Sequence, residues 1–172
     1  MAASPREAAV QIRFTHRFDR PIDDVWAMFA DPASHVAKFT RMGHRDLEVL
    51  SEEVTEDALD LTVRRQVDLD VPAVAAKFIS PSNTVTSTDH WERSADGSCS
   101  GHFTVDIKGA PAESRGSTRL EADGDATAYT VELDVKVKVP LVGDKVAKAL
   151  RPQLEAQMAE EFEAAEAWLA EH

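Results

Sequence analysis

The chain has 172 residues, enough for one domain whose core needs neither disulfides nor a metal ion. Its formal net charge of −12 opposes binding to nucleic acids and to anionic lipid headgroups, because both carry the same sign of charge. Cys99 is the only cysteine, which excludes an intramolecular disulfide and favours a cytoplasmic location.

Residues 1–9 contain no apolar run of the kind that forms a secretory signal or a membrane span. We therefore expect a flexible tail over 1–9, followed by one domain over 10–172 without integral membrane association.

The first predicted strand runs from Val10 to Phe18, where apolar and polar residues alternate with the period of a half-buried strand. Pro21 then favours the start of a short helix over Ile22 to Ala30. After Asp31 and Pro32, a second short helix is expected from Ala33 to Thr40.

The next part of the chain is predicted to form strands joined by tight polar turns, which implies an antiparallel meander. A short helical insert is expected between Val71 and Ile79, after Pro72 and before Pro81. The expected strands are approximately Arg45–Val54, Leu59–Leu69, Thr84–Glu92, Ser98–Lys108, Glu113–Ala122 and Ala128–Val139.

The last segment, Leu141 to His172, is predicted to be one long amphipathic helix. Its large apolar residues recur at steps of four and three, so they share one side of the helix and need a partner surface. Antiparallel strands with helices on one face are an α+β architecture. A curved sheet that grips one helix leaves a gap between them, which is the expected ligand site.

Two stretches carry a resemblance to a known family. Phe14-Thr15-His16 leads into Pro21–Phe29 (PIDDVWAMF), and Val135–Gly143 (VKVKVPLVG) leads into the long helix. This order resembles the helix-grip fold of the START-like (SRPBCC) superfamily, which includes lipid-transfer domains, the birch pollen allergen class and polyketide aromatase/cyclases. Together with His90-Trp91-Glu92, the second stretch is similar to an actinobacterial branch of this superfamily that is described only as a domain of unknown function. The resemblance implies a curved seven-stranded antiparallel sheet around the C-terminal helix.

Arg65 is in phase with Leu61, Val63 and Val67, so it is expected to point inward. An inward arginine needs an anion as its partner, unless its side chain extends to the rim of the cavity. The anion is either a carboxylate or phosphate of a ligand, or an acidic side chain of the protein. Asp89 is the candidate acid, because it shares a phase with Val85, Ser87 and Trp91. The register of that strand is open, since Thr84, Thr86, Thr88 and His90 form an equally regular face.

His16 shares the phase of Phe14 and Phe18 and is either a structural histidine or a group that contacts the cavity. His16 and Asp89 are the candidate acid and base for catalysis. The spacing of the histidines and the single cysteine give no metal site, and no cofactor motif is present.

An aromatic and aliphatic lining would suit a flat or aliphatic ligand. Together with His16, Arg65 and Asp89, the residues expected to line the cavity are Phe14, Trp26, Phe29, Phe39, Phe78, Trp91, Phe103, Tyr129, Leu133, Leu154, Met158 and Phe162.

Three functions follow, in order of preference. The first is a carrier or sensor that binds a small hydrophobic, lipid-like or polyketide-like molecule in a cavity of at least about 300 Å³. The second is a cyclase or dehydratase that uses the same cavity. The third is a non-catalytic protein-interaction domain with an exposed apolar patch. The chain is expected to be a monomer or a weak homodimer.

Overall fold

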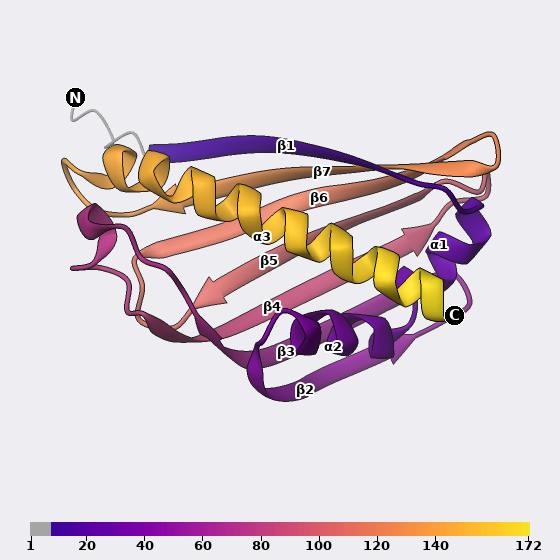
Figure 1. The fold of residues 1–172 in the computed structure, drawn as a ribbon, viewed down its shortest axis with the longest axis horizontal. Coiled ribbons are helices and arrows are strands. Elements are labelled where there is room, and N and C mark those ends of the chain that lie inside the picture. Colours follow the sequence, from indigo (N-terminus) through magenta and orange to yellow (C-terminus); the bar gives the residue numbers. More distant parts are fainter. Residues whose placement is uncertain (1–7) are drawn as a thin grey trace, which may run out of the picture.

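The computed structural model describes residues 8–172. In it, one long helix lies across the concave face of a curved antiparallel sheet (Figure 1). The sheet order is β1-β7-β6-β5-β4-β3-β2, so the first strand pairs with the last and β1 and β2 are the two edges. The strands are β1 Ala8–Phe18, β2 Arg45–Val54, β3 Ala58–Asp68, β4 Ser82–Arg93, β5 Cys99–Ile107, β6 Ala112–Asp123 and β7 Ala126–Val137.

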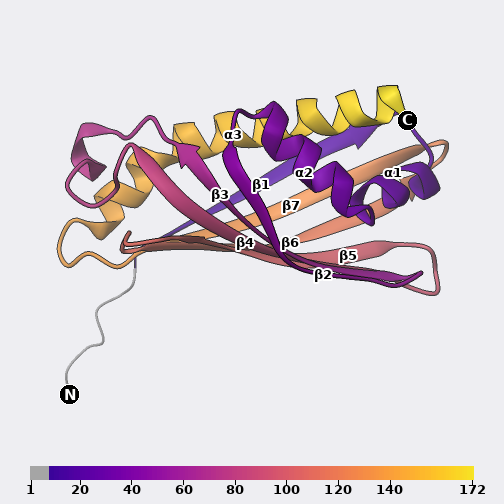
Figure 2. The ribbon, with the colours of Figure 1, turned by 90° about the horizontal axis from the view of Figure 1, so that it is seen from below.

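All the helices lie on one side of the sheet (Figure 2). Two short helices, α1 (Ile22–Phe29) and α2 (Pro32–Arg41), follow β1, and α3 (Gly143–Glu171) closes the chain. A 3₁₀ turn, η1 (Ala73–Ala75), lies between β3 and β4 and packs against α3. This is the α+β helix-grip architecture that the sequence predicts.

Two apolar clusters hold α3 against the sheet. One gathers around Phe18, Trp91 and Tyr129 and includes Leu169 near the end of α3. The other gathers around Val10 and Ile79 and includes Val146 and Ala147 near the start of α3. The helix is therefore held near both ends, and residues of its middle, such as Leu154 and Met158, are partly buried against the same clusters.

Polar contacts support the C-terminal half of α3. The Arg20 guanidinium donates to the backbone oxygen of Leu169 at 2.8 Å, and the Lys38 ammonium lies 3.5 Å from the Glu161 carboxylate. These contacts join α3 to the β1–α1 connection and to α2.

Some boundaries differ from those predicted. β1 begins at Ala8, so Ala8 and Ala9 belong to the sheet; the rest of the expected tail, residues 1–7, lies outside the described residues. The predicted insert between Val71 and Ile79 contains only the short turn η1, because Pro72 and Pro81 bound a segment too short for a stable α-helix. Pro152 favours a bend of the last helix near Lys148 to Pro152, because proline removes one backbone hydrogen bond, and α3 is one helix from Gly143 to Glu171 with Pro152 inside it.

Two glycines allow aromatic rings to lie close to the inner face of the sheet. A Cβ atom on Gly116 would lie 2.2 Å from the Glu132 backbone oxygen and 2.5 Å from the Phe103 ring. A Cβ atom on Gly101 would lie 2.3 Å from the His90 backbone oxygen and 3.1 Å from the Trp91 ring. Since backbone atoms cannot move aside cheaply, both positions require glycine.

We expect Gly116→Ala to lower the free energy of unfolding by about 1–3 kcal/mol, because the added methyl group overlaps a backbone oxygen and the Phe103 ring. Ser117→Ala, on the outer face of the same strand, is the control and should change the free energy by less than about 0.5 kcal/mol. Urea unfolding followed by circular dichroism measures both. Equal stability of the two variants would contradict the tight contact at Gly116.

Candidate functional site

Two neighbouring hollows lie between the sheet and the helices. The larger has a volume of about 160 Å³ and lies between the sheet and the middle of α3. Most of its wall is aliphatic and comes from the inward faces of the strands and the facing side of α3. The apolar lining residues are Met42, Val67, Leu69, Ile79, Val85, Phe103, Val105, Ile107, Ala112, Leu133, Val135, Leu150, Leu154 and Met158. At the end nearest α2 the wall becomes polar, with His44, Arg65 and Glu161.

The second hollow is smaller, at about 70 Å³, and is lined by aromatic and charged side chains. It shares Arg65, Phe103, Val105, Met158 and Glu161 with the first, so the two are neighbours along the inner face of the sheet. Its other lining residues are Phe29, His35, Lys38, Phe39, Ser87, Asp89, Trp91, Thr118, Tyr129 and Val131. Both hollows are smaller than the volume of at least about 300 Å³ expected from the sequence. The Phe103 ring, which lines both, occupies part of the space between them.

An open groove of about 560 Å³ leads toward the larger hollow from the surface. It lies between the α2–β2 connection, the β3–η1 connection and α3. The groove and the larger hollow share Met42, His44, Val67, Gln153 and Gln157. These shared residues form the neck between the surface and the interior.

Gln153 joins α3 to the other wall of this groove. In the amide orientation that satisfies both groups, its nitrogen donates to the Asp70 backbone oxygen at 2.8 Å and its oxygen accepts from the Asp70 backbone N–H at 3.3 Å. The segment between β3 and η1 is therefore tied to α3 beside the neck.

Arg65 is the central polar group of the interior. Its side chain comes from β3, and the residue is only 6% exposed. The guanidinium lies over the Phe39 ring at 3.7 Å, donates from Nε to His44 Nδ1 at 3.1 Å and donates from Nη1 to Ser87 Oγ at 2.8 Å. Burial lowers the pKa of Arg65 to about 10, although Glu161 and Asp89 oppose the shift, so the group remains a cation at neutral pH.

The two histidines near Arg65 are neutral. Burial, followed by the positive charge of Arg65, lowers the pKa of His44 to about 4. Burial and then Lys38 also lower the pKa of His35, whose Nε2 lies 2.8 Å from the Phe29 backbone oxygen. Because that oxygen can only accept, His35 Nε2 carries the proton.

Tyr129 supplies a hydroxyl to the smaller hollow. Burial raises its pKa well above the ordinary value of 10, and the nearby carboxylates of Glu161 and Asp89 raise it further. The hydroxyl is therefore protonated and can donate a hydrogen bond to a bound molecule.

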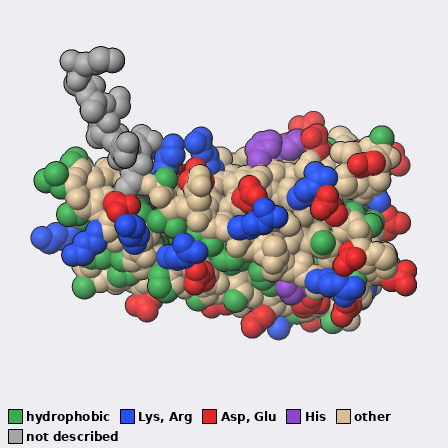
Figure 3. Space-filling view, turned by 90° about the horizontal axis from the view of Figure 1, so that it is seen from above, with side chains coloured by type: hydrophobic (Ala, Val, Ile, Leu, Met, Phe, Trp, Pro, Cys, Tyr) green, Lys and Arg blue, Asp and Glu red, His purple; other side chains and the backbone are tan. Residues whose placement is uncertain are grey.

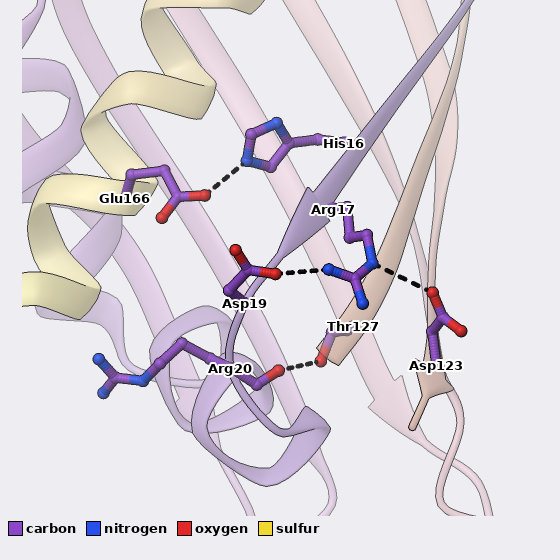
Figure 4. Close-up of polar contacts among 7 residues, drawn as sticks. All are labelled: His16, Arg17, Asp19, Arg20, Asp123, Thr127 and Glu166. Atoms are coloured by element: carbon purple, nitrogen blue, oxygen red, sulfur yellow. Dashed lines mark hydrogen bonds and ion pairs between the residues drawn. The ribbon is translucent and has the colours of Figure 1, made fainter. Parts of the chain in front are cut away.

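The structure does not bring His16 and Asp89 together. His16 lies at the seam between β1 and α3, where its Nε2 is 2.7 Å from Glu166 Oε1 (Figure 4) and its ring stacks on Phe162 at 4.7 Å. Asp89 lines the smaller hollow. Val85, Ser87 and Trp91, which share its face of β4, are buried, so this face of the strand points inward. His16 lines neither hollow.

The other predicted ligand-binding residues divide into two groups. The larger hollow is lined by five of them: Arg65, Phe103, Leu133, Leu154 and Met158. The smaller hollow is lined in addition by Phe29, Phe39, Trp91 and Tyr129. The remaining predicted residues pack in the core or at its margin without lining either hollow: Phe14, Trp26, Phe78 and Phe162.

Sequence reasoning missed His44, Lys38 and Glu161. Glu161 had a signal, because it lies seven residues after Leu154 and therefore on the same face of the helix. His44 lies in a turn and Lys38 in a short helix, where no strand period predicts the direction of a side chain.

The outer face of the sheet carries a separate, shallow groove of about 560 Å³. Its polar wall includes Arg13, His102, Arg115 and Glu132. His90 and His102 lie side by side on this face, with ring centroids 4.9 Å apart. Within residues 8–172, no group of three or more His, Cys, Asp or Glu side chains is placed to hold a metal ion.

The surface along the β1 edge mixes basic and acidic side chains, and apolar side chains gather toward the left end of the view (Figure 3). The ion pairs Arg13–Glu132, at 3.1 Å, and Arg17–Asp123, at 3.2 Å, link β1 to β7 and to β6. Among the described helices, none has the length and apolar character needed to cross a membrane.

Solved structures with the same fold cover almost the whole chain. The protein TTHA0849 from Thermus thermophilus is 12% identical with a TM-score of 0.64, covering 94% of this chain and 97% of that chain. The Zhui aromatase/cyclase from a Streptomyces species (R1128) is 19% identical with a TM-score of 0.63, covering 94% of each chain. Norcoclaurine synthase from Thalictrum flavum, in complex with dopamine and hydroxybenzaldehyde, is 14% identical with a TM-score of 0.57, covering 100% and 96%.

At these identities the likeness establishes the fold, which is the helix-grip fold of START-like proteins. No curated protein sequence matches the chain significantly. One family model matches residues 13–169, which is nearly the whole described domain. The chain therefore belongs to the family described as protein of unknown function DUF2505.

Proposed function

We propose that this protein binds a small, mainly apolar molecule between the sheet and α3, as a carrier or a sensor. The observation that carries the proposal is the shared lining of the open groove and the larger hollow at Met42, His44, Val67, Gln153 and Gln157. A molecule that enters the groove has a route to an aliphatic interior, and aliphatic walls with few polar groups are typical of ligand sites.

The relatives support this reading at the level of the fold. Norcoclaurine synthase, in the structure named above, holds dopamine and hydroxybenzaldehyde, which are small aromatic molecules. The fold can thus accommodate ligands of this size.

Native mass spectrometry of protein purified from its own cells tests the proposal directly. We expect a small apolar molecule to copurify and to be recovered chemically unchanged. Protein that carries no such molecule, and that also fails to bind apolar dyes, would contradict the proposal.

A second candidate is an enzyme of the cyclase or dehydratase type. It is favoured by the carboxylates of Asp89 and Glu161 and the protonated hydroxyl of Tyr129, which line the smaller hollow together. Recovery of a chemically altered molecule would favour this candidate over a carrier. A protein-interaction domain has less support, because the exposed large apolar residues are divided between β2 and the β7–α3 connection.

Filling the larger hollow should weaken binding. Val135 is 3% exposed and lines this hollow, so Val135→Phe places a ring in the proposed ligand space. We expect the affinity for the neutral dye Nile red, measured by fluorescence titration, to fall at least about tenfold, or about 1.4 kcal/mol.

Thr130→Phe is the matched control, because it adds the same ring to the outer face of the same strand. Its dye affinity should match that of the unmodified protein. If both variants bind Nile red normally, the dye lies elsewhere and the proposed site is wrong.

The polar end of the site depends on a neutral His44, since its Nδ1 accepts from Arg65. The unfolded chain binds a proton at His44 near the ordinary pKa of 6.5, whereas the folded chain does so only near about 4. Between these values the unfolded state binds more protons, so stability falls as the pH is lowered from 6.5 toward 4.

His44→Gln keeps a neutral acceptor for Arg65 and removes this titration. We expect the variant to lose less stability than the unmodified protein between pH 7 and pH 4.5, measured by urea unfolding. His35 has a lowered pKa for the same main reason and is present in both proteins, so the difference reports on His44. Identical pH profiles would show that His44 titrates freely in the folded state.

A further inference from the structure

Arg65 carries a buried positive charge among neutral partners. Its guanidinium donates hydrogen bonds to His44 Nδ1, to Ser87 Oγ and, at 3.5 Å, to the Val63 backbone oxygen. A guanidinium has more N–H donors than these contacts use. The stacked Phe39 ring adds an attraction to the cation but no negative charge.

Within residues 8–172, no carboxylate oxygen lies within 4.0 Å of the Arg65 guanidinium. Glu161, which faces the same hollow, instead lies 3.5 Å from the Lys38 ammonium. Asp89 lines the smaller hollow with Arg65 but makes no ion pair with it. The longer-range attraction of these two acids does not offset burial, which still lowers the pKa of Arg65.

Burying a charged group without a counterion in contact with it costs free energy of folding, and the cost rises when its hydrogen-bond partners are removed. Arg65 borders both hollows, so an anion inside the site would meet the guanidinium without any change in the backbone. Such an anion would form charge-assisted hydrogen bonds, which arginine makes preferentially to planar carboxylates and to phosphates.

We infer that the ligand is an amphiphile with an oxyanion head group, a carboxylate or a phosphate, that binds Arg65 while its apolar part fills the larger hollow. This inference rests on the proposed function and adds the chemical class of the ligand. Uncharged sterol-like or hydrocarbon molecules would leave the charge of Arg65 without a partner.

The position of the neck sets the orientation of the bound molecule. His44 lines both the groove and the larger hollow and is bonded to Arg65, so the head group lies beside the neck. The aliphatic wall extends away from Arg65 toward Ile107, Val135 and Leu150. The apolar part therefore enters first, and the head group is the last part to pass the neck.

A comparison of ligands with one chain length isolates the head group. The affinities of decanoate, decyl phosphate and decanol are measured at pH 7.4 by their displacement of Nile red, and they are compared within each variant. We expect at least one anion to bind about tenfold or more tightly than decanol, as hydrogen bonds to a charged group imply. Which anion is preferred separates a carboxylate ligand from a phosphate ligand.

Arg65→Gln should reduce the preference for the anion over decanol to less than about twofold. Arg64→Gln is the matched control, because Arg64 is the adjacent residue on the outer face, where it pairs with Glu48, and its variant should keep the preference. Arg65→Met, which preserves the apolar stem, serves if the glutamine variant does not fold. The preference is a ratio within one protein, so a modest loss of stability cancels.

Equal binding of all three ligands to the unmodified protein would overturn the inference while leaving the proposed function intact. An anion preference that persists in Arg65→Gln or Arg65→Met would also overturn it. Failure of every ligand and of Nile red to bind would instead contradict the proposed function, and this inference with it.

Discussion

The contact of α3 with the concave face of the sheet is the interaction on which the other features of the molecule depend. α3 packs at its start on the cluster around Val146 and at its end on the cluster around Leu169, while large side chains from the sheet approach its middle. The apolar area buried at the two ends stabilises the whole arrangement. The space that remains lies between the curved sheet and this single helix.

The charges of the interior are arranged in one region and not spread over the wall. α2 contributes Lys38, α3 contributes Glu161, and β3 and β4 contribute Arg65 and Asp89. Four separate elements thus supply charged groups in one region of a mainly apolar space. Under the proposed function, this polarity sets the direction in which a ligand lies. The rings of Trp91 and Phe103 lie close to the backbone at Gly101 and Gly116, where a Cβ atom would meet them.

The sequence predicted the fold well because most strands have a buried and an exposed face. The phase of β3 correctly placed Arg65 inside, since a residue two positions from Val63 and Val67 must share their face. The pairing of His16 with Asp89 could not be judged in this way. β1 and β4 are separated by β7, β6 and β5, which puts them roughly 19 Å apart along the sheet. Residues outside the periodic elements, such as His44, gave no signal of direction.

The tie between Gln153 and the β3–η1 connection involves only the main chain of Asp70. Any side chain at position 70 therefore preserves it, whereas proline, which lacks the N–H group, would remove one of its two bonds. Both partners are uncharged amides, so added salt does not weaken the connection as it would an exposed ion pair. The hydrogen bonds between α3 and the β3–η1 connection are therefore insensitive to ionic strength, and they tolerate substitution of the side chain at position 70.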